Sequence, residues 1–237
     1  MAYNTVLVIP DLHVPYHHHQ AFDFLDLVDR TYNTGKRRKV VCLGDEVDHH
    51  SISFHDNDPD LPFSPSAELE KAIWYLKDLY ALFPRVSVVE SNHGSLVYRK
   101  GKHCGLPRSV FRSYREILEA PKGWVWTYDL TLKCGSKSVY FHHGQSKNVL
   151  RNSLFKSQCY VQGHHHGTFD IQYWANSENL FWGMTAGCLI DKDSYAFAYG
   201  RTNLPKPIIG CGVIINGYPK LIPMVLDKKG KWIGKII

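Results

Sequence analysis

Five short apolar runs in this chain each end in residues that commonly bind metal ions, and this pattern restricts the fold more than any other feature. The blocks are Asp11 and His13 after TVLVIP, Asp45 and Asp48 after VVCLG, Asn92 and His93 after VSVVES, His142 and His143 after SVYF, and His164, His165 and His166 after CYVQG. Ligands in open α/β folds gather where the carboxyl ends of strands meet, so one fold can bring all five blocks together. Because burying an unpaired carboxylate costs several kcal/mol, charged strand ends of this kind face either water or a cation.

The order of predicted helices and strands indicates a layered α/β fold. Helices are predicted over residues 20–32, 66–83, 107–120 and 148–156. Strands are predicted over residues 5–10, 40–43 and 86–89, and then in the runs WVWTYDLTL, SVYFHH, CYVQG, TFDIQYW, IIGCGVIIN and KLIPMVL. Alternation followed by many strands predicts two packed sheets with helices outside. No linker divides the chain, so residues 1–237 are expected to form one domain, and the Pro-rich loop at 51–65 to border a site.

Composition narrows the kind of protein. With 237 residues, 44% of them hydrophobic, the chain can bury a substantial core. A formal net charge of +6 favours phosphate-bearing or otherwise acidic partners. Six scattered cysteines without a C-x-x-C pair are typical of reduced thiols in a cytoplasm. The N-terminus lacks a signal-peptide pattern and no apolar run reaches membrane-spanning length, so neither secretion nor a membrane partner is expected.

The ligand types narrow the choice of metal. Mixed carboxylate, carboxamide and imidazole sets suit Mn, Fe, Zn, Co or Ni better than Mg or Ca, and no thiolate lies in the five blocks. Two ions about 3.5–4 Å apart can activate water and hold a phosphoryl group, and such a pair needs a bridging carboxylate. Asp45 is the natural bridge.

The five blocks also resemble the motifs of a known family. In order, Asp11-Leu12-His13, Gly44-Asp45-x-x-Asp48, Asn92-His93, His143-Gly144 and Gly163-His164-His165-His166 are similar to the D-x-H, G-D-x-x-D, G-N-H-[DE], H and G-H-x-H blocks of the calcineurin-like metallophosphoesterases. The resemblance implies a four-layer αββα sandwich of two mainly mixed β-sheets flanked by helices. The sequences of the loops and of the C-terminal part resemble those of compact phage-encoded members. A phage-encoded protein of this kind would be expected in the host-cell cytoplasm.

The resemblance also implies roles for individual residues. One divalent ion would be held by Asp11, His13, Asp45 and His166, and a second by Asp45, Asn92, His143 and His164, with manganese the preferred metal. A hydroxide bridging the two ions would attack phosphorus in line with the leaving oxygen. His93 would protonate that oxygen or stabilise the growing charge, and Asp48 would orient a ligand or a histidine by hydrogen bonding.

Two residues depart from the family pattern. Ser91 stands where the family has Gly, and Gly94 stands where an acidic residue commonly follows the Asn-His pair. That missing carboxylate would normally orient the catalytic histidine, so His93 needs Asp48 or another carboxylate as its partner. Of the adjacent histidines, His143 is expected to be the ligand because it precedes a glycine, with His142 on the opposite face of the strand.

The substrate-binding residues remain open between two interpretations. Residues 96–115 contain no acidic residue and six basic ones, Arg99, Lys100, Lys102, Arg108, Arg112 and Arg115. This segment, with Arg99 foremost, could grip substrate phosphate or a nucleic-acid strand, or it could be a solvated helix face with core aromatics. His49 could contact substrate or lie on the surface. The tract His17–His19 is expected to be mainly a solvated loop.

Together these features predict a metal-dependent phosphoric ester hydrolase that acts on nucleotides or nucleic acid. A phosphodiesterase or nuclease acting on DNA or RNA is the alternative to a nucleotide phosphomonoesterase. A catalytically weak nucleic-acid-binding protein with a structural metal site is a second alternative. Nothing in the sequence fixes the oligomeric state.

Overall fold

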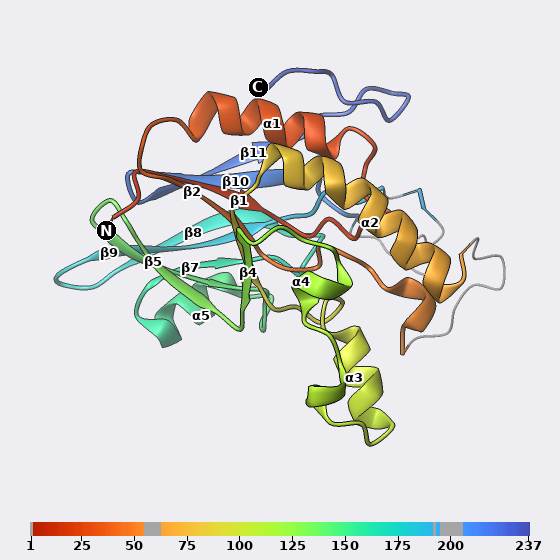
Figure 1. The fold of residues 1–237 in the computed structure, drawn as a ribbon. Coiled ribbons are helices and arrows are strands. Elements are labelled where there is room, and N and C mark those ends of the chain that lie inside the picture. Colours follow the sequence, from red (N-terminus) through yellow and green to blue (C-terminus); the bar gives the residue numbers. More distant parts are fainter. Residues whose placement is uncertain (1, 55–62, 192, 195–205) are drawn as a thin grey trace.

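Two β-sheets, each with strands of mixed direction, form the central layers of the computed structural model (Figure 1). The structure describes residues 2–54, 63–191, 193–194 and 206–237. In the first sheet, ordered β11-β10-β1-β2-β3-β4, the last four strands run parallel, and β10 is antiparallel to β1 and to β11. Its strands are β1 (Thr5–Ile9), β2 (Arg38–Cys42), β3 (Val86–Val89), β4 (Trp124–Thr127), β10 (Gly210–Ile215) and β11 (Tyr218–Pro223).

The second sheet has the order β5-β6-β7-β9-β8. Its three inner strands run parallel, and the two outer strands are antiparallel to their neighbours. The strands are β5 (Leu130–Cys134), β6 (Lys137–His142), β7 (Cys159–Gln162), β8 (Phe169–Ala175) and β9 (Leu180–Ala186). Each sheet therefore has a parallel centre, whose strand ends can build a site.

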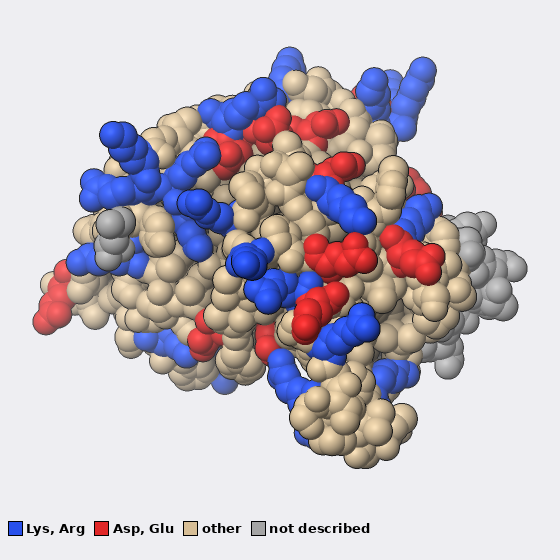
Figure 2. Space-filling view, in the orientation of Figure 1, with Lys and Arg blue, Asp and Glu red and all other residues tan. Residues whose placement is uncertain are grey.

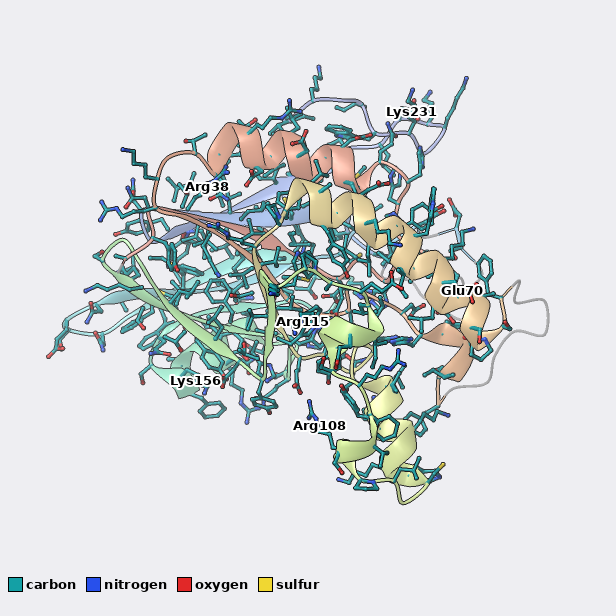
Figure 3. The ribbon with its side chains drawn as sticks, viewed as in Figure 1. Arg38, Glu70, Arg108, Arg115, Lys156 and Lys231 are labelled. Carbon is teal, nitrogen blue, oxygen red and sulfur yellow. The ribbon has the colours of Figure 1, made fainter. Side chains whose placement is uncertain are left out.

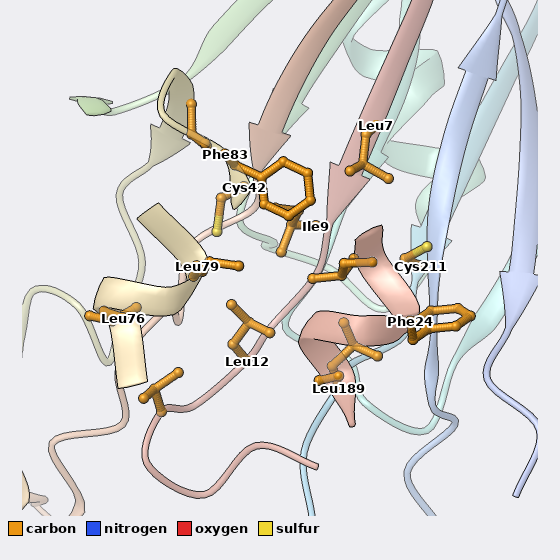
Figure 4. Close-up of a cluster of buried hydrophobic side chains, with 14 of the residues drawn as sticks. Leu7, Ile9, Leu12, Phe24, Cys42, Leu76, Leu79, Phe83, Leu189 and Cys211 are labelled. Carbon is orange, nitrogen blue, oxygen red and sulfur yellow. The ribbon is translucent and has the colours of Figure 1, made fainter. Parts of the chain in front are cut away.

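Side chains of β1 alternate between two apolar interiors, as the two-residue period of a strand requires. Val6 and Val8 belong to the cluster between the two sheets, which also contains Phe141 and Met184 of the second sheet. Leu7 and Ile9 point the other way and pack beneath α1 (Ala21–Tyr32) and α2 (Pro65–Leu82), beside Phe24 and Leu76 (Figure 4). A strand buried on both faces reads as the unbroken apolar run TVLVI.

A helix on the outer face of the second sheet completes a fourth layer. α5 (Val149–Lys156) packs on β7 and β9, where Val149 joins Tyr140 and Tyr160 in a small apolar cluster. A Cβ at Gly183 of β9 would lie 2.8 Å from the carbonyl oxygen of Val149, so only glycine permits this approach. The four-layer αββα sandwich is thus confirmed (Figure 1). Within the described ranges, no helix combines the length and hydropathy that a membrane crossing requires.

The segment predicted as one helix over 107–120 is instead broken, and that prediction is wrong. A 3₁₀ turn covers Arg108–Val110, the chain is extended at Phe111, and α4 covers only Tyr114–Ile117 after a capping box at Ser113. Phe111 leaves the helical path because its ring packs against Gly101 of a helix not expected from sequence, α3 (Leu96–His103), where an added Cβ would lie 2.0 Å from the ring. Tertiary packing overrides the local helix signal here.

Two strand expectations also need correction. The run WVWTYDLTL divides between the sheets, because β4 ends at Thr127 and β5 begins at Leu130. The strand β9 was not expected from the sequence.

The histidine tract is mostly buried, contrary to the solvated loop predicted for it. His17 is 7% exposed, stacks on Phe22 with ring centroids 4.6 Å apart and meets Tyr75 edge-on. His18 donates from Nε2 to the carbonyl oxygen of Gly230 at 2.9 Å. His19 alone is exposed.

Candidate metal centre

Loops from both sheets meet at one edge of the sandwich. They follow β1, β2 and β3 of the first sheet and β6 and β7 of the second. Nδ1 of His143 lies 2.8 Å from the carbonyl oxygen of Leu43, and the N–H of His164 donates to Oδ2 of Asp11 at 2.7 Å. Hydrogen bonds between the two sheets therefore connect the strand-end blocks, as the sequence pattern predicts.

The first group of atoms that could hold a metal ion comes from Asp11, His13 and His166. Nε2 of His166 lies 3.0 Å from Oδ2 of Asp11 and 3.2 Å from Nε2 of His13. Oδ2 of Asp45 approaches the same point, 3.4 Å from Nε2 of His13. Asp11 and His13 are essentially inaccessible to solvent. Four side chains predicted to share one ion thus converge.

The second group comes from Asp45, His143 and His164. Nε2 of His143 lies 3.2 Å from Nδ1 of His164, and 2.7 Å from Oδ1 of Asn92. It also lies 3.2 Å from Oδ2 of Asp45, the oxygen that faces His13 in the first group. A single carboxylate oxygen therefore faces both groups, which is the arrangement a bridging ligand needs.

The chemistry of these groups fits divalent cations. Oδ1 of Asp11 is buried and has no hydrogen-bond partner within the described residues, which a cation would compensate. Burial lowers the pKa of His143, but the charges of Asp45 and Asp11 outweigh it and raise that pKa to about 9. Burial lowers the pKa of His164 to about 4. Nitrogen and oxygen donors that include a neutral imidazole match the preferences of transition metals.

Asp48 joins two histidines of the centre. Its Oδ1 lies 3.0 Å from Nδ1 of His13 and 2.7 Å from Nδ1 of His93. The first contact fixes the ring of His13 so that Nε2 faces the ligand group. Burial lowers the pKa of His93, but the charges of Asp45 and Asp48 raise it to about 10. Asp48 therefore supplies the carboxylate that Gly94 does not.

Ser91, one of the two departures from the motif, links two ligand loops. Its Oγ accepts hydrogen bonds from the N–H of Asp45 at 2.7 Å and from the N–H of Gly94 at 3.1 Å. The loops approach so closely that a Cβ at Gly44 would lie 2.5 Å from Cβ of Ser91, and Gly44 has φ +91°. Ser91 thus fixes the backbone at Asp45, whose carboxylate faces both ligand groups. This role cannot be predicted from the sequence alone.

The structure separates the two adjacent histidines after β6. His143 contributes to the ligand group, as described above. The ring of His142 lies parallel to that of Tyr140, with centroids 6.2 Å apart, and its Nδ1 accepts from the N–H of Gly144 at 3.1 Å. His142 therefore has a packing role outside both ligand groups.

The two predicted substrate contacts lie beside the centre. Arg99 is exposed on α3 and donates from Nη1 to the carbonyl oxygen of Asn92 at 3.2 Å. His49 is 8% exposed, and burial lowers its pKa to about 4 despite the charge of Asp48. Both remain candidates for substrate contact.

One further positioning residue was missed from the sequence. The buried carboxylate of Glu68 in α2 accepts hydrogen bonds from the N–H of His50 at 2.7 Å and from the N–H of Ser51 at 2.8 Å. It also pairs with the hydroxyl of Ser51. Glu68 thereby anchors the loop that follows the second ligand block. In the sequence it resembles an ordinary acidic residue in the first turn of a helix.

Comparison with known proteins gives fold-level likenesses. No family model matches the chain, and no curated protein does. Among solved structures, an archaeal phosphodiesterase is 13% identical with a TM-score of 0.46, over 92% of this chain and 99% of that one. Yfce, a phosphoesterase from E. coli, is 13% identical with a TM-score of 0.45, over 98% of each chain. Neither is similar enough to assign an activity to this protein.

Proposed function

We propose that this protein is a dinuclear metal-dependent phosphoric ester hydrolase. The observation that carries the proposal is the position of Asp45, whose Oδ2 lies 3.4 Å from Nε2 of His13 and 3.2 Å from Nε2 of His143. A carboxylate oxygen between two ligand groups is what a two-ion site requires. The motif resemblance of the five blocks supports the same reading.

The two ligand groups divide between two ions. Asp11, His13, Asp45 and His166 would hold one, and Asp45, Asn92, His143 and His164 the other. When bound, the ions would activate water and neutralise charge on the phosphoryl group. The donor set favours manganese, with iron, zinc, cobalt and nickel as further members of the same class.

His93 would act as the proton donor. Its Nδ1 is held by Asp48, which leaves Nε2 as the atom that can carry a proton to a leaving oxygen. In the metal-free protein, burial lowers the pKa of His93, but the charges of Asp45 and Asp48 outweigh it and raise that pKa to about 10, which favours the protonated ring. The contact between His93 and Asp48 also favours a catalytically active enzyme over the alternative of a catalytically weak nucleic-acid-binding protein.

Hydrolysis of a nitrophenyl phosphate ester in the presence of manganese tests the proposal. Activity should disappear with a chelator and return when manganese is restored. Asp45→Ala should abolish it, whereas Asp26→Ala on the outer surface of α1 should not. Retention of the wild-type circular dichroism spectrum would show that the Asp45 variant folds. A wild-type protein inactive with every divalent metal tested on mono- and diesters would refute the proposal.

The substrate is proposed to be a nucleotide or a nucleic acid. Release of inorganic phosphate from a mononucleotide would identify a phosphomonoesterase, and cleavage of a labelled strand would identify a phosphodiesterase or nuclease. Cytoplasmic location and similarity to phage-encoded members stay predictions.

A further inference from the structure

A basic arm projects from the sandwich beside the candidate metal centre. We define the arm as residues 96–115, comprising α3, the 3₁₀ turn at Arg108–Val110 and the start of α4 (Figure 1). Its cationic side chains are Arg99, Lys100, Lys102, Arg108, Arg112 and Arg115. All but the half-buried Lys100 are exposed, and no acidic residue lies between 91 and 115. On the face shown in Figure 2, basic side chains lie at the base and edges of the projecting arm, and others lie on the body together with the acidic ones.

Most of this charge forms no ion pair within the part of the chain that the structure describes. Within the described residues, only Arg108 of the arm forms an ion pair, with Glu90 at 3.3 Å. Figure 3 shows Arg108 on the arm and Arg115 at its junction with the body. Several like charges on one small projection repel one another, so the arm is suited to a partner with many negative charges.

The aromatic residues of the arm serve its internal packing. The hydroxyl of Tyr98 donates to the carbonyl oxygen of Arg112 at 2.6 Å, and its ring meets Phe111 and Tyr114 edge-on. The guanidinium of Arg108 lies 4.6 Å from the centre of the Tyr98 ring. These faces are therefore occupied, and the arm offers charge for phosphates rather than platforms for stacked bases.

The arm is continuous with the candidate metal centre. α3 begins three residues after His93, and Arg99 donates to the carbonyl oxygen of the ligand Asn92 at 3.2 Å. A groove of about 350 Å³ is lined by Arg99, Lys102 and Arg108 of the arm, and also by Glu90, the ion-pair partner of Arg108. An eight-residue helix rises about 12 Å, a length over which one strand of B-form DNA carries about three phosphates.

We propose that the basic arm binds the sugar-phosphate backbone of a nucleic-acid strand whose scissile phosphodiester lies at the metal centre. The position of the scissile group rests on the proposed function, whereas the contact between strand and arm does not. A strand with repeated phosphates can contact several cations of the arm at once, whereas a free mononucleotide carries its phosphate charge at one position only. Binding should depend little on base sequence, because only the backbone is contacted.

Fluorescence anisotropy with a labelled oligothymidylate tests the contact, in a chelator so that no cleavage occurs. Lys102→Glu/Arg112→Glu changes two exposed residues of the arm. Lys228→Glu/Lys231→Glu makes the same change in net charge on the C-terminal segment, at the opposite end of the molecule, where Figure 3 shows Lys231. We expect the arm variant to weaken binding about tenfold or more and to reduce the slope of log K against log salt by about 1.4. The control should bind within about twofold of wild type.

Equal weakening by both variants would show that only net charge matters, and no weakening by the arm variant would exclude the arm; either result overturns the proposal. Wild-type protein that hydrolyses a nitrophenyl ester but does not bind the strand would overturn this proposal alone. Arm-dependent binding without hydrolysis under any divalent metal would refute the proposed function and leave the arm contact standing.

Discussion

Nδ1 of His93 lies 2.7 Å from Oδ1 of Asp48, which belongs to the loop after β2 rather than to the residue that follows His93. A buried carboxylate at this distance fixes the ring and favours its protonated form. The glycine at position 94 therefore does not deprive the histidine of a partner.

Asp48→Asn should reduce kcat most for esters with poor leaving groups. Proton donation to the leaving oxygen raises the reaction rate about 10²-fold or more when that oxygen is basic. It raises the rate little when the leaving group is a nitrophenolate. We expect a large loss on phenyl phosphate and a small loss on nitrophenyl phosphate, measured as kcat at saturating metal. His93→Asn should show the same dependence. Equal losses on the two esters would indicate that Asp48 acts only through His13.

Metal content should respond differently to two ligand substitutions. Asp45→Ala removes the oxygen that faces both groups, so the purified protein should retain neither ion. His166→Ala removes a ligand of the first group only, and about one ion per chain should remain. Elemental analysis after dialysis measures both, with Asp26→Ala as a surface control. Equal metal content in wild type and Asp45→Ala would contradict the shared site.

Gly163→Ala should impair metal binding without a general loss of stability. An added Cβ would lie 2.2 Å from Oδ1 of Asp11, so the carboxylate must move. We expect metal affinity to fall about tenfold or more, measured by isothermal titration. Gly35→Ala is the control because Gly35 has φ +92° and nothing within 4 Å of an added Cβ. It should cost stability of about 1 kcal/mol and leave metal affinity unchanged.

His17 should make the protein less stable in acid. Burial lowers its pKa to about 4 in the folded state, against about 6.5 when unfolded. The unfolded chain therefore binds this proton first, and stability falls as the pH drops from 6.5 to 4, by up to about 3 kcal/mol. His17→Phe keeps the stacking with Phe22 and should flatten this dependence in urea unfolding. His19→Phe, at an exposed position, should leave the pH dependence of stability unchanged. If His17→Phe also leaves it unchanged, the lowered pKa of His17 does not cause the loss of stability in acid.

The sequence indicated which side chains would come together in the two candidate ligand groups, because each belongs to a short block directly behind a strand. Asp11 and His13 follow β1, and that local pattern is readable without knowing the fold. The roles of Ser91 and Glu68 were not predicted, because they depend on contacts with residues 46 and 18 positions away. The layers were predictable from buried strands, whose periodicity is local.

Elements whose form depends on a distant partner were missed. Gly101 weakens the helix signal of α3, yet it is the residue against which Phe111 packs. The strand run 124–132 carries no glycine or proline, so Asp129 is the one turn-favouring residue that marks the crossing between the sheets. β9 contains Gly183, and glycine weakens the strand signal in a sequence. In the structure this glycine allows α5 to pack closely on the strand.

Each ligand group takes a carboxylate from the first sheet and an imidazole from the second. A bound ion would therefore link the two sheets. It would stabilise their packing in addition to any role in catalysis. The metal-free protein should therefore unfold at a lower temperature than the metal-loaded protein.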